Sequence, residues 1–161
     1  MVPLVRKHLL SARVKCSDTV NVRRRLLEIG AEPIGAYREV DTYFSVPRGW
    51  LKLTVVNGMK GRLVYCEREV ADGLREVTMI IADVEKPGEL AAVLRAALGI
   101  ERVEDRVREV YRFGEVRIYV DRIKGRGEFL ELEVEAGAEK GAKEAIEGIM
   151  RKLGVREEST E

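Results

Sequence analysis

Strict alternation of apolar and polar residues is the feature of this sequence that most restricts its fold. Four segments alternate with a period of two, which is typical of strands with one buried face: residues 10–16, 51–55, 116–121 and 130–135. Three more segments look extended with less regular alternation: residues 62–70, 76–82 and 106–113. Asn57-Gly58 and Asp72-Gly73 lie between such segments and supply the positive φ that tight hairpin turns require. Because hairpins join antiparallel strands, the pattern predicts an antiparallel sheet rather than a parallel wound one.

Three segments carry apolar residues at helical spacing, about residues 18–29, 87–98 and 140–153. Each is followed by a glycine, the residue that helices favour after their last turn: Gly30, Gly99 and Gly154. In the first helix the expected apolar stripe includes the following residues: Val20, Val22, Leu26, Leu27 and Ile29. The order strand, helix, strand meander, helix, strand meander, helix predicts the α+β class. At 161 residues the chain fits a single domain, 1–161, with its core over about residues 8–154.

Charge balance and hydropathy exclude several classes of partner. The chain has 29 Lys+Arg and 28 Asp+Glu, a net charge of +1, whereas a binder of nucleic-acid polymers needs a basic surplus. The apolar runs, such as residues 79–82, are far shorter than the roughly 20 residues that span a bilayer. We therefore expect neither a nucleic-acid polymer nor a membrane as partner. The sequence does not fix the oligomeric state, and a homodimer is compatible with it.

Cysteine and amide usage bear on the environment of the chain. Cys16 and Cys66, with His8 as the only histidine, form neither a disulfide framework nor a zinc site. Cys16 belongs to the packed face and Cys66 to the opposite face, so we expect them to be unbonded and the protein to be cytoplasmic. The absence of Gln and the presence of only Asn21 and Asn57 indicate a heat-adapted source.

The polar faces of the predicted strands carry an unusual number of charges: Arg13, Lys15, Lys52, Arg62, Glu115, Arg117, Asp121, Glu131, Glu133 and Glu135. A solvated sheet face is the ordinary interpretation of such a pattern. The alternative is that the sheet curls so that these charges line a tunnel, with the aliphatic face packed under the three helices. Enclosed arginines and lysines would hold phosphate oxygens, and enclosed carboxylates would hold magnesium.

Five segments in order resemble the CYTH superfamily, which contains CyaB-type class IV adenylyl cyclases, thiamine triphosphatases and triphosphate tunnel metalloenzymes. They are Lys15, Val-Asp-Thr-Tyr-Phe at 40–44, Leu-Lys-Leu at 51–53, Arg-Val-Arg-Glu-Val-Tyr at 106–111, and residues 116–133. The resemblance covers about residues 8–154. It implies an eight-stranded antiparallel β tunnel or barrel with helices outside, which binds a small-molecule triphosphate or nucleotide together with Mg or Mn.

The resemblance also implies roles for individual residues. Phosphate contacts would come from Lys15, Lys52, Arg75, Arg106 and Arg108, with Arg117 on the same charged face as a further substrate contact. Of these, Lys15, Arg106 and Arg108 would be catalytic. The metal ligands would be Asp121, Glu131 and Glu133.

The first strand departs from the family pattern. The family reads Glu-x-Glu-x-Lys where this chain has Ser11, Arg13 and Lys15, so both carboxylates are missing and one position is a cation. Losing two carboxylates removes about half of the implied metal ligation, and Arg13 would repel a divalent ion at short range.

Three functions remain open from the sequence. The first is a metal-dependent triphosphate enzyme, either a hydrolase or, with less support, a cyclase that converts ATP to cyclic AMP. The second is a catalytically impaired module that binds a phosphate ligand, with Arg13 as a fixed positive charge in place of the metal. The third is a scaffold with a vestigial tunnel.

Overall fold

The computed structural model describes residues 4–71, 73–135 and 141–156. These residues form eight strands: β1 (Val5–Lys15), β2 (Glu32–Phe44), β3 (Trp50–Val56), β4 (Lys60–Ala71), β5 (Leu74–Val84), β6 (Ile100–Phe113), β7 (Val116–Ile123) and β8 (Gly127–Glu135). They also form three helices: α1 (Thr19–Glu28), α2 (Pro87–Leu98) and α3 (Ala142–Leu153).

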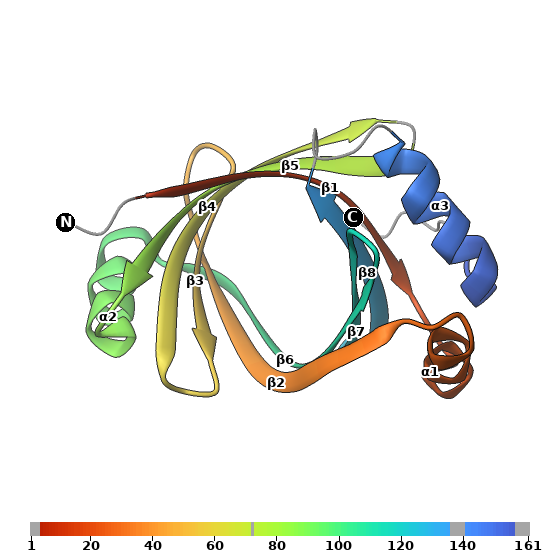
Figure 1. Cartoon of the computed structure of the whole chain (residues 1–161). Coiled ribbons are helices and arrows are strands. Elements are labelled where there is room, and N and C mark those ends of the chain that lie inside the picture. The colour runs from red at the N-terminus through yellow and green to blue at the C-terminus, as the bar shows by residue number, and fades with distance from the viewer. Residues whose placement is uncertain (1–3, 72, 136–140, 157–161) are drawn as a thin grey trace.

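The strands close into one antiparallel barrel in the order β1-β5-β4-β3-β2-β6-β7-β8, with β8 pairing back onto β1. Figure 1 shows the barrel nearly end-on, with the helices outside the ring of strands. The predicted α+β class, the eight-stranded antiparallel barrel and the outer helices are therefore confirmed. Closure leaves no sheet edge and gives every strand one face toward the barrel interior.

Tight turns at glycines set the register of the hairpins. Asn57 and Gly58 both have positive φ, 51° and 71°, as the turn between β3 and β4 requires. Gly114 has φ 59° between β6 and β7. In the second predicted turn, Gly73 has φ 77°, while Asp72 lies outside the described residues.

The main hydrophobic core lies outside the barrel, between the strands and two of the helices. Outward-facing residues of β1, β7 and β8 pack under α1 and α3: Ala12, Val14, Ile118, Leu130 and Leu132 among them. Helix α1 begins after Asp18, whose carboxylate accepts a hydrogen bond from the Asn21 N–H. Cys16 is buried in this core and Cys66 faces the interior, and both are free, as predicted.

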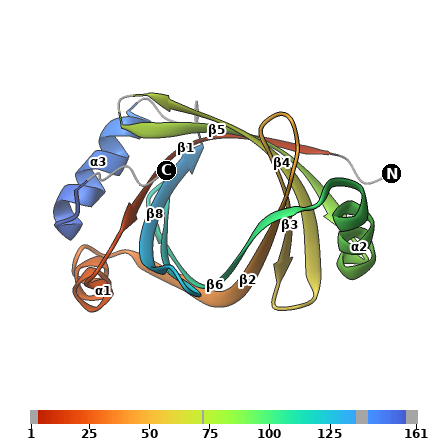
Figure 2. The same cartoon turned by 180° about the vertical axis from the view of Figure 1, so that it is seen from behind.

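The expectation that the aliphatic face packs under all three helices is wrong for α2. This helix has no buried residue and lies beside β2, β3 and β4, away from α1 and α3 (Figure 2). Two members of the expected α1 stripe are also exposed: Val20 is 76% exposed and Leu27 is 60% exposed. The short helix buries only a narrow face, which contains Val22 and Leu26.

Strand β2 begins well before the 40–44 segment that carries the family resemblance. The sequence did not indicate this extension, because residues 32–37 show no alternation. Pro33 and Gly35 disfavour strand in isolation, and the pairing with β6 shifts register between them. Pairing along β6 overrides this local preference. Among the described residues, no helix has the length and apolar character needed to cross a membrane.

Candidate anion-binding tunnel

The barrel interior holds a cavity of about 180 Å³, which leaves room for on the order of a dozen waters. All eight strands contribute to its lining. Eight lining residues are cations: Lys7, Arg13, Lys52, Arg62, Arg68, Arg75, Arg106 and Arg108. Three lining residues are carboxylates: Glu39, Glu131 and Glu133. The charged strand faces therefore curve around a hollow, and cations predominate on its wall.

Arg108 and Asp121 form a buried bidentate pair between β6 and β7. Arg108 Nε and Nη2 donate to Asp121 Oδ1 and Oδ2, each at 2.8 Å. Asp121 is 1% exposed, and its Oδ2 also accepts from Arg106 Nη1 at 3.3 Å. The guanidinium of Arg108 lies over the Tyr119 ring, 4.1 Å from its centroid. Both carboxylate oxygens are thus committed to arginines.

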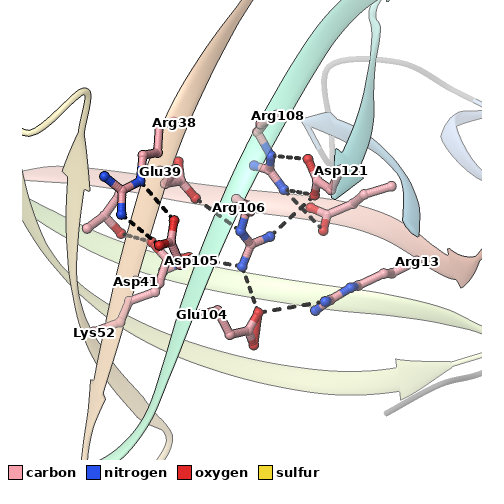
Figure 3. A network of polar contacts seen from close by, with 12 residues as sticks. Arg13, Arg38, Glu39, Asp41, Lys52, Glu104, Asp105, Arg106, Arg108 and Asp121 are labelled. Carbon is pink, nitrogen blue, oxygen red and sulfur yellow. Dashed lines mark hydrogen bonds and ion pairs between the residues drawn. The ribbon is translucent and has the colours of Figure 1, made fainter. Parts of the chain in front are cut away.

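Arg106 lies at the centre of the network shown in Figure 3. Its Nη2 donates to Glu104 at 2.7 Å and to Asp41 at 3.2 Å. Asp41 is itself held by the Thr54 hydroxyl at 2.7 Å and lies 3.5 Å from Lys52 Nζ. Burial works against the charge on Lys52, but Asp41, Tyr43 and Glu39 together outweigh it and raise the pKa of Lys52.

Arg13 projects into the tunnel and is not fully satisfied there. Its Nη2 lies 3.7 Å from Glu104 Oε2, and its guanidinium lies 4.7 Å from the Phe129 centroid. The side chain is 7% exposed, yet Nε and Nη2 have no hydrogen-bond acceptor. The ion pair is thus with Glu104, from β6, rather than with Glu131 or Glu133.

Arg75, from β5, is a second under-satisfied cation. Its Nη2 is 4.0 Å from Glu131 Oε1, the limit of an ion pair, and its buried Nε has no acceptor. Burial and the neighbouring cations lower its pKa, against the attraction of Glu131. Because buried N–H groups without acceptors cost free energy, the Arg13 and Arg75 side chains favour an anion in the cavity.

The two lumen carboxylates of β8 have opposite pKa shifts. Burial opposes the charge on Glu131, but Arg108, Arg75 and Arg13 outweigh it and lower its pKa to about 2. Burial and the charge of Glu131 raise the pKa of Glu133, although its hydrogen bond from the Tyr119 hydroxyl, at 2.6 Å, acts in the opposite direction. Glu131 therefore stays ionised, while Glu133 holds a proton more readily than an ordinary glutamate.

The described residues do not fit a resident divalent metal. They contain no group of three or more His, Cys, Asp or Glu side chains placed to hold one ion. The oxygens of Asp121 are taken by arginines, Glu131 lies between Arg75 and Arg108, and Glu133 is bound by Tyr119. The assignment of Asp121, Glu131 and Glu133 as ligands of Mg or Mn stays a prediction that these contacts do not support.

The predicted phosphate contacts separate into two groups. Lys52, Arg75, Arg106 and Arg108 line the cavity together. Lys15 and Arg117 do not: both are exposed beyond the cavity lining. Lys15 lies at the end of β1 beside Gly127, and Arg117 lines an outer pocket that shares Lys7, Leu9 and Glu133 with the cavity.

The sequence indicated Arg13 as a fixed positive charge and Arg62 as part of the charged face, but it assigned no site role to three further residues of the lining or the network: Arg68, Glu39 and Glu104. Strand parity gave a signal for Arg68, which shares the parity of Arg62 and Cys66 along β4. Glu104 also shares the parity of Arg106, two residues away. Glu39 shares the parity of Asp41, but the residues that precede it, 32–37, do not alternate and so did not indicate a strand that reaches it.

Comparisons with known proteins agree with this architecture. A protein of Pyrococcus horikoshii has a similar structure, with a TM-score of 0.82, 22% identity and 92% of each chain covered. A conserved hypothetical protein of Pyrococcus furiosus gives a TM-score of 0.79 at 24% identity, covering 95% of this chain and 93% of its own. A Vibrio parahaemolyticus protein, provisionally described as an adenylate cyclase, gives 0.73 at 13% identity, covering 94% and 91%.

At these identities the structural similarities show the fold alone, and no curated protein matches the sequence significantly. The family comparison reaches further, because the CYTH domain model matches residues 5–161, nearly the whole chain. The chain therefore belongs to the CYTH domain family.

Proposed function

We propose that the tunnel binds a small-molecule triphosphate, inorganic or organic, through its cations and without a resident metal. The observation that carries this proposal is the pair of cavity-lining arginines, Arg13 and Arg75, each of which has buried N–H groups without acceptors. Phosphate oxygens are strong acceptors that arginine matches in geometry as well as charge.

The charge of the lining supports the same conclusion. Eight cations line the cavity, against three lining carboxylates and three buried carboxylates that pair with them, Asp41, Glu104 and Asp121. A polyanion would offset this excess. Arg13, where the family pattern has a carboxylate, would then provide the positive charge that a metal supplies in other members.

Calorimetry with tripolyphosphate tests the proposal. We expect binding that EDTA does not weaken, because no described cluster of ligands holds a metal. Arg75→Ala should weaken binding by roughly 10- to 100-fold, the value of a hydrogen bond to a charged group. Arg38→Ala is the matched control, because this exposed arginine pairs with Asp105 outside the cavity lining.

Two results would contradict the proposal: tripolyphosphate that does not bind, or binding that disappears in EDTA and returns with manganese.

A double variant, Ser11→Glu with Arg13→Glu, restores the acidic family pattern on β1. We expect its tripolyphosphate binding to become dependent on magnesium or manganese, since it replaces the fixed cation with two carboxylates.

Hydrolysis is a second candidate, which the opposite pKa shifts of Glu131 and Glu133 favour. Two carboxyls whose pKa values are pushed apart can serve as acid and base in one site. Glu133, with the raised pKa, is the better matched proton acceptor for an attacking water.

Phosphate release from tripolyphosphate or ATP, measured with and without manganese, tests this activity, and cyclic AMP in the same ATP reaction tests a cyclase. A hydrolase that uses Glu133 should lose most of its turnover in Glu133→Gln while still binding tripolyphosphate. No release above background under either condition would exclude hydrolysis and leave the binding proposal intact.

A further inference from the structure

The lumen wall has two chemically different arcs. Charged residues line β2, β3, β6 and β8, one end of β5, and both ends of the lining stretches of β1 and β4: Lys7 and Arg13 on β1, and Arg62 and Arg68 on β4. Between these charged ends, the wall on β1, β5 and β4 is apolar except for Ser11, and these three strands are adjacent in the barrel. Its apolar lining residues are Leu9, Val64, Cys66, Val77, Met79 and Ile81.

Strand β5 connects the two arcs along its own lumen face. Every second residue faces the cavity, so β5 presents first Arg75 and then Val77, Met79 and Ile81. At about 3.4 Å per residue, the aliphatic row begins about 7 Å beyond Arg75. The neighbouring strands widen the row, because Leu9 pairs with Val77, Cys66 with Met79 and Val64 with Ile81. Two cations border it on these strands: Arg68 opposite Val77, and Lys7 opposite Met79.

These apolar side chains offer a ligand almost no hydrogen bonds. Apart from the weak thiol of Cys66, the arc has no polar side-chain atom, and Val64, Val77 and Ile81 are each 8% exposed or less. A nucleobase placed against it would lose the hydrogen bonds of its polar edges, which is costly. A hydrocarbon group placed there would lose none.

We propose that the ligand is amphiphilic: an aliphatic ester of a polyphosphate, whose anionic head lies among Arg13, Arg75 and Arg108 and whose hydrocarbon tail lies along the apolar arc. This inference rests on the proposed function and names the substrate class of the same site. The position of Val77 next to Arg75 makes the head and the tail contiguous. The cavity of about 180 Å³ limits the enclosed tail to a few carbons.

A series of alkyl triphosphates tests the inference by calorimetry with the full chain. Methyl, ethyl, propyl and butyl triphosphate carry the same head, so differences in affinity report the tail alone. Burial of a methylene increases affinity by about fourfold, and we expect butyl triphosphate to bind at least tenfold more tightly than methyl triphosphate. ATP should bind more weakly than butyl triphosphate.

Two variants test whether the hydrocarbon tail of the ligand lies along the apolar arc. Val77→Thr keeps the shape of the side chain but adds a hydroxyl, and it should reduce the affinity for butyl triphosphate at least fivefold while leaving tripolyphosphate within twofold. Val107→Thr on β6 is the control, because Val107 is 48% exposed and outside the cavity lining, and it should change neither affinity.

Equal affinities across the alkyl series, alongside clear binding of tripolyphosphate, would overturn this inference and leave the proposed function intact. Equal losses of both ligands in Val77→Thr would also overturn it, since the arc would then serve the barrel and not the tail. Failure of tripolyphosphate and of every alkyl triphosphate to bind would overturn both proposals.

Discussion

Burial decides how much an arginine–aspartate pair contributes to the stability of the fold, as two pairs in this protein illustrate. Arg108 with Asp121 and Arg38 with Asp105 share one bidentate geometry, with Nε on Oδ1 and Nη2 on Oδ2. The Asp121 side chain is 1% exposed, while that of Arg38 is 62% exposed. Solvent therefore screens the outer pair, whereas the inner pair holds two tunnel arginines in position.

Asp121→Asn should destabilise the protein by about 3–5 kcal/mol, because it leaves buried guanidinium charge uncompensated. Asp105→Asn, the matched control, should barely change the free energy of unfolding, because water replaces the lost contact. Urea denaturation at neutral pH measures both. A similar small effect for the two variants would show that the inner pair is not a structural anchor. A metal ligand role for Asp121 would instead make the stability of the wild type sensitive to EDTA.

Glu131 and Glu133 should give opposite pH dependences of stability. The pKa of Glu131 is lowered from 4.5 to about 2, so its stabilising contribution is complete above pH 4.5 and is lost as pH falls towards 2. The pKa of Glu133 is raised above 4.5, so the folded protein takes up the proton first, and stability is gained as pH falls towards 4.5.

Free energies of unfolding from pH 7 to pH 2 test this contrast. The difference between wild type and Glu131→Gln should shrink below pH 4.5, whereas the difference between wild type and Glu133→Gln should change in favour of the wild type as pH falls towards 4.5. Parallel curves for both variants would mean that the tunnel does not separate the two carboxyls.

At the scale of elements, the pattern of the sequence predicts best where local periodicity and burial coincide. The alternation in β1, β3, β7 and β8 indicates both the strands and the faces that line the lumen. The same rule fails in the first half of β2, where residues 32–37 show no buried position and Pro33 and Gly35 weaken the signal. It also misplaces Leu27, because apolar residues at helical spacing do not reveal how wide a face the barrel covers.

Substitutions of two adjacent leucines of α1 test how narrow the buried face of this helix is. Leu26 is fully buried and Leu27 is 60% exposed. Leu26→Ala should cost about 2–5 kcal/mol, from lost burial and the cavity left behind, whereas Leu27→Ala should have a much smaller effect. Thermal or urea unfolding measures the pair. Equal costs would mean that Leu27 is covered in solution, for example by a second copy of the chain.

For the whole molecule, closure of the barrel is what turns a charged sheet face into a site. The sequence indicated the cations individually, and the resemblance indicated a tunnel. Neither could show which charges pair, because Arg13 meets Glu104 and Arg75 approaches Glu131 only across strands far apart in sequence. Lys15 and Arg117 have the lumen parity but lie beyond the ends of the enclosed space.

Composition and closure together predict high thermal stability. The chain lacks Gln, has two Asn, and is 35% charged, and ion networks of this kind gain importance as temperature rises. We expect a melting midpoint above the roughly 45–65 °C range of mesophilic domains, measured by circular dichroism. A midpoint within that range would contradict the heat-adapted origin.

A crystal structure of the protein soaked with tripolyphosphate and manganese tests the central claim most directly. The claim predicts triphosphate density in contact with Arg13 and Arg75 and no anomalous manganese signal beside Glu131 and Glu133. A manganese ion bound jointly by these carboxylates and the phosphate chain, or a tunnel that contains no triphosphate, would contradict it.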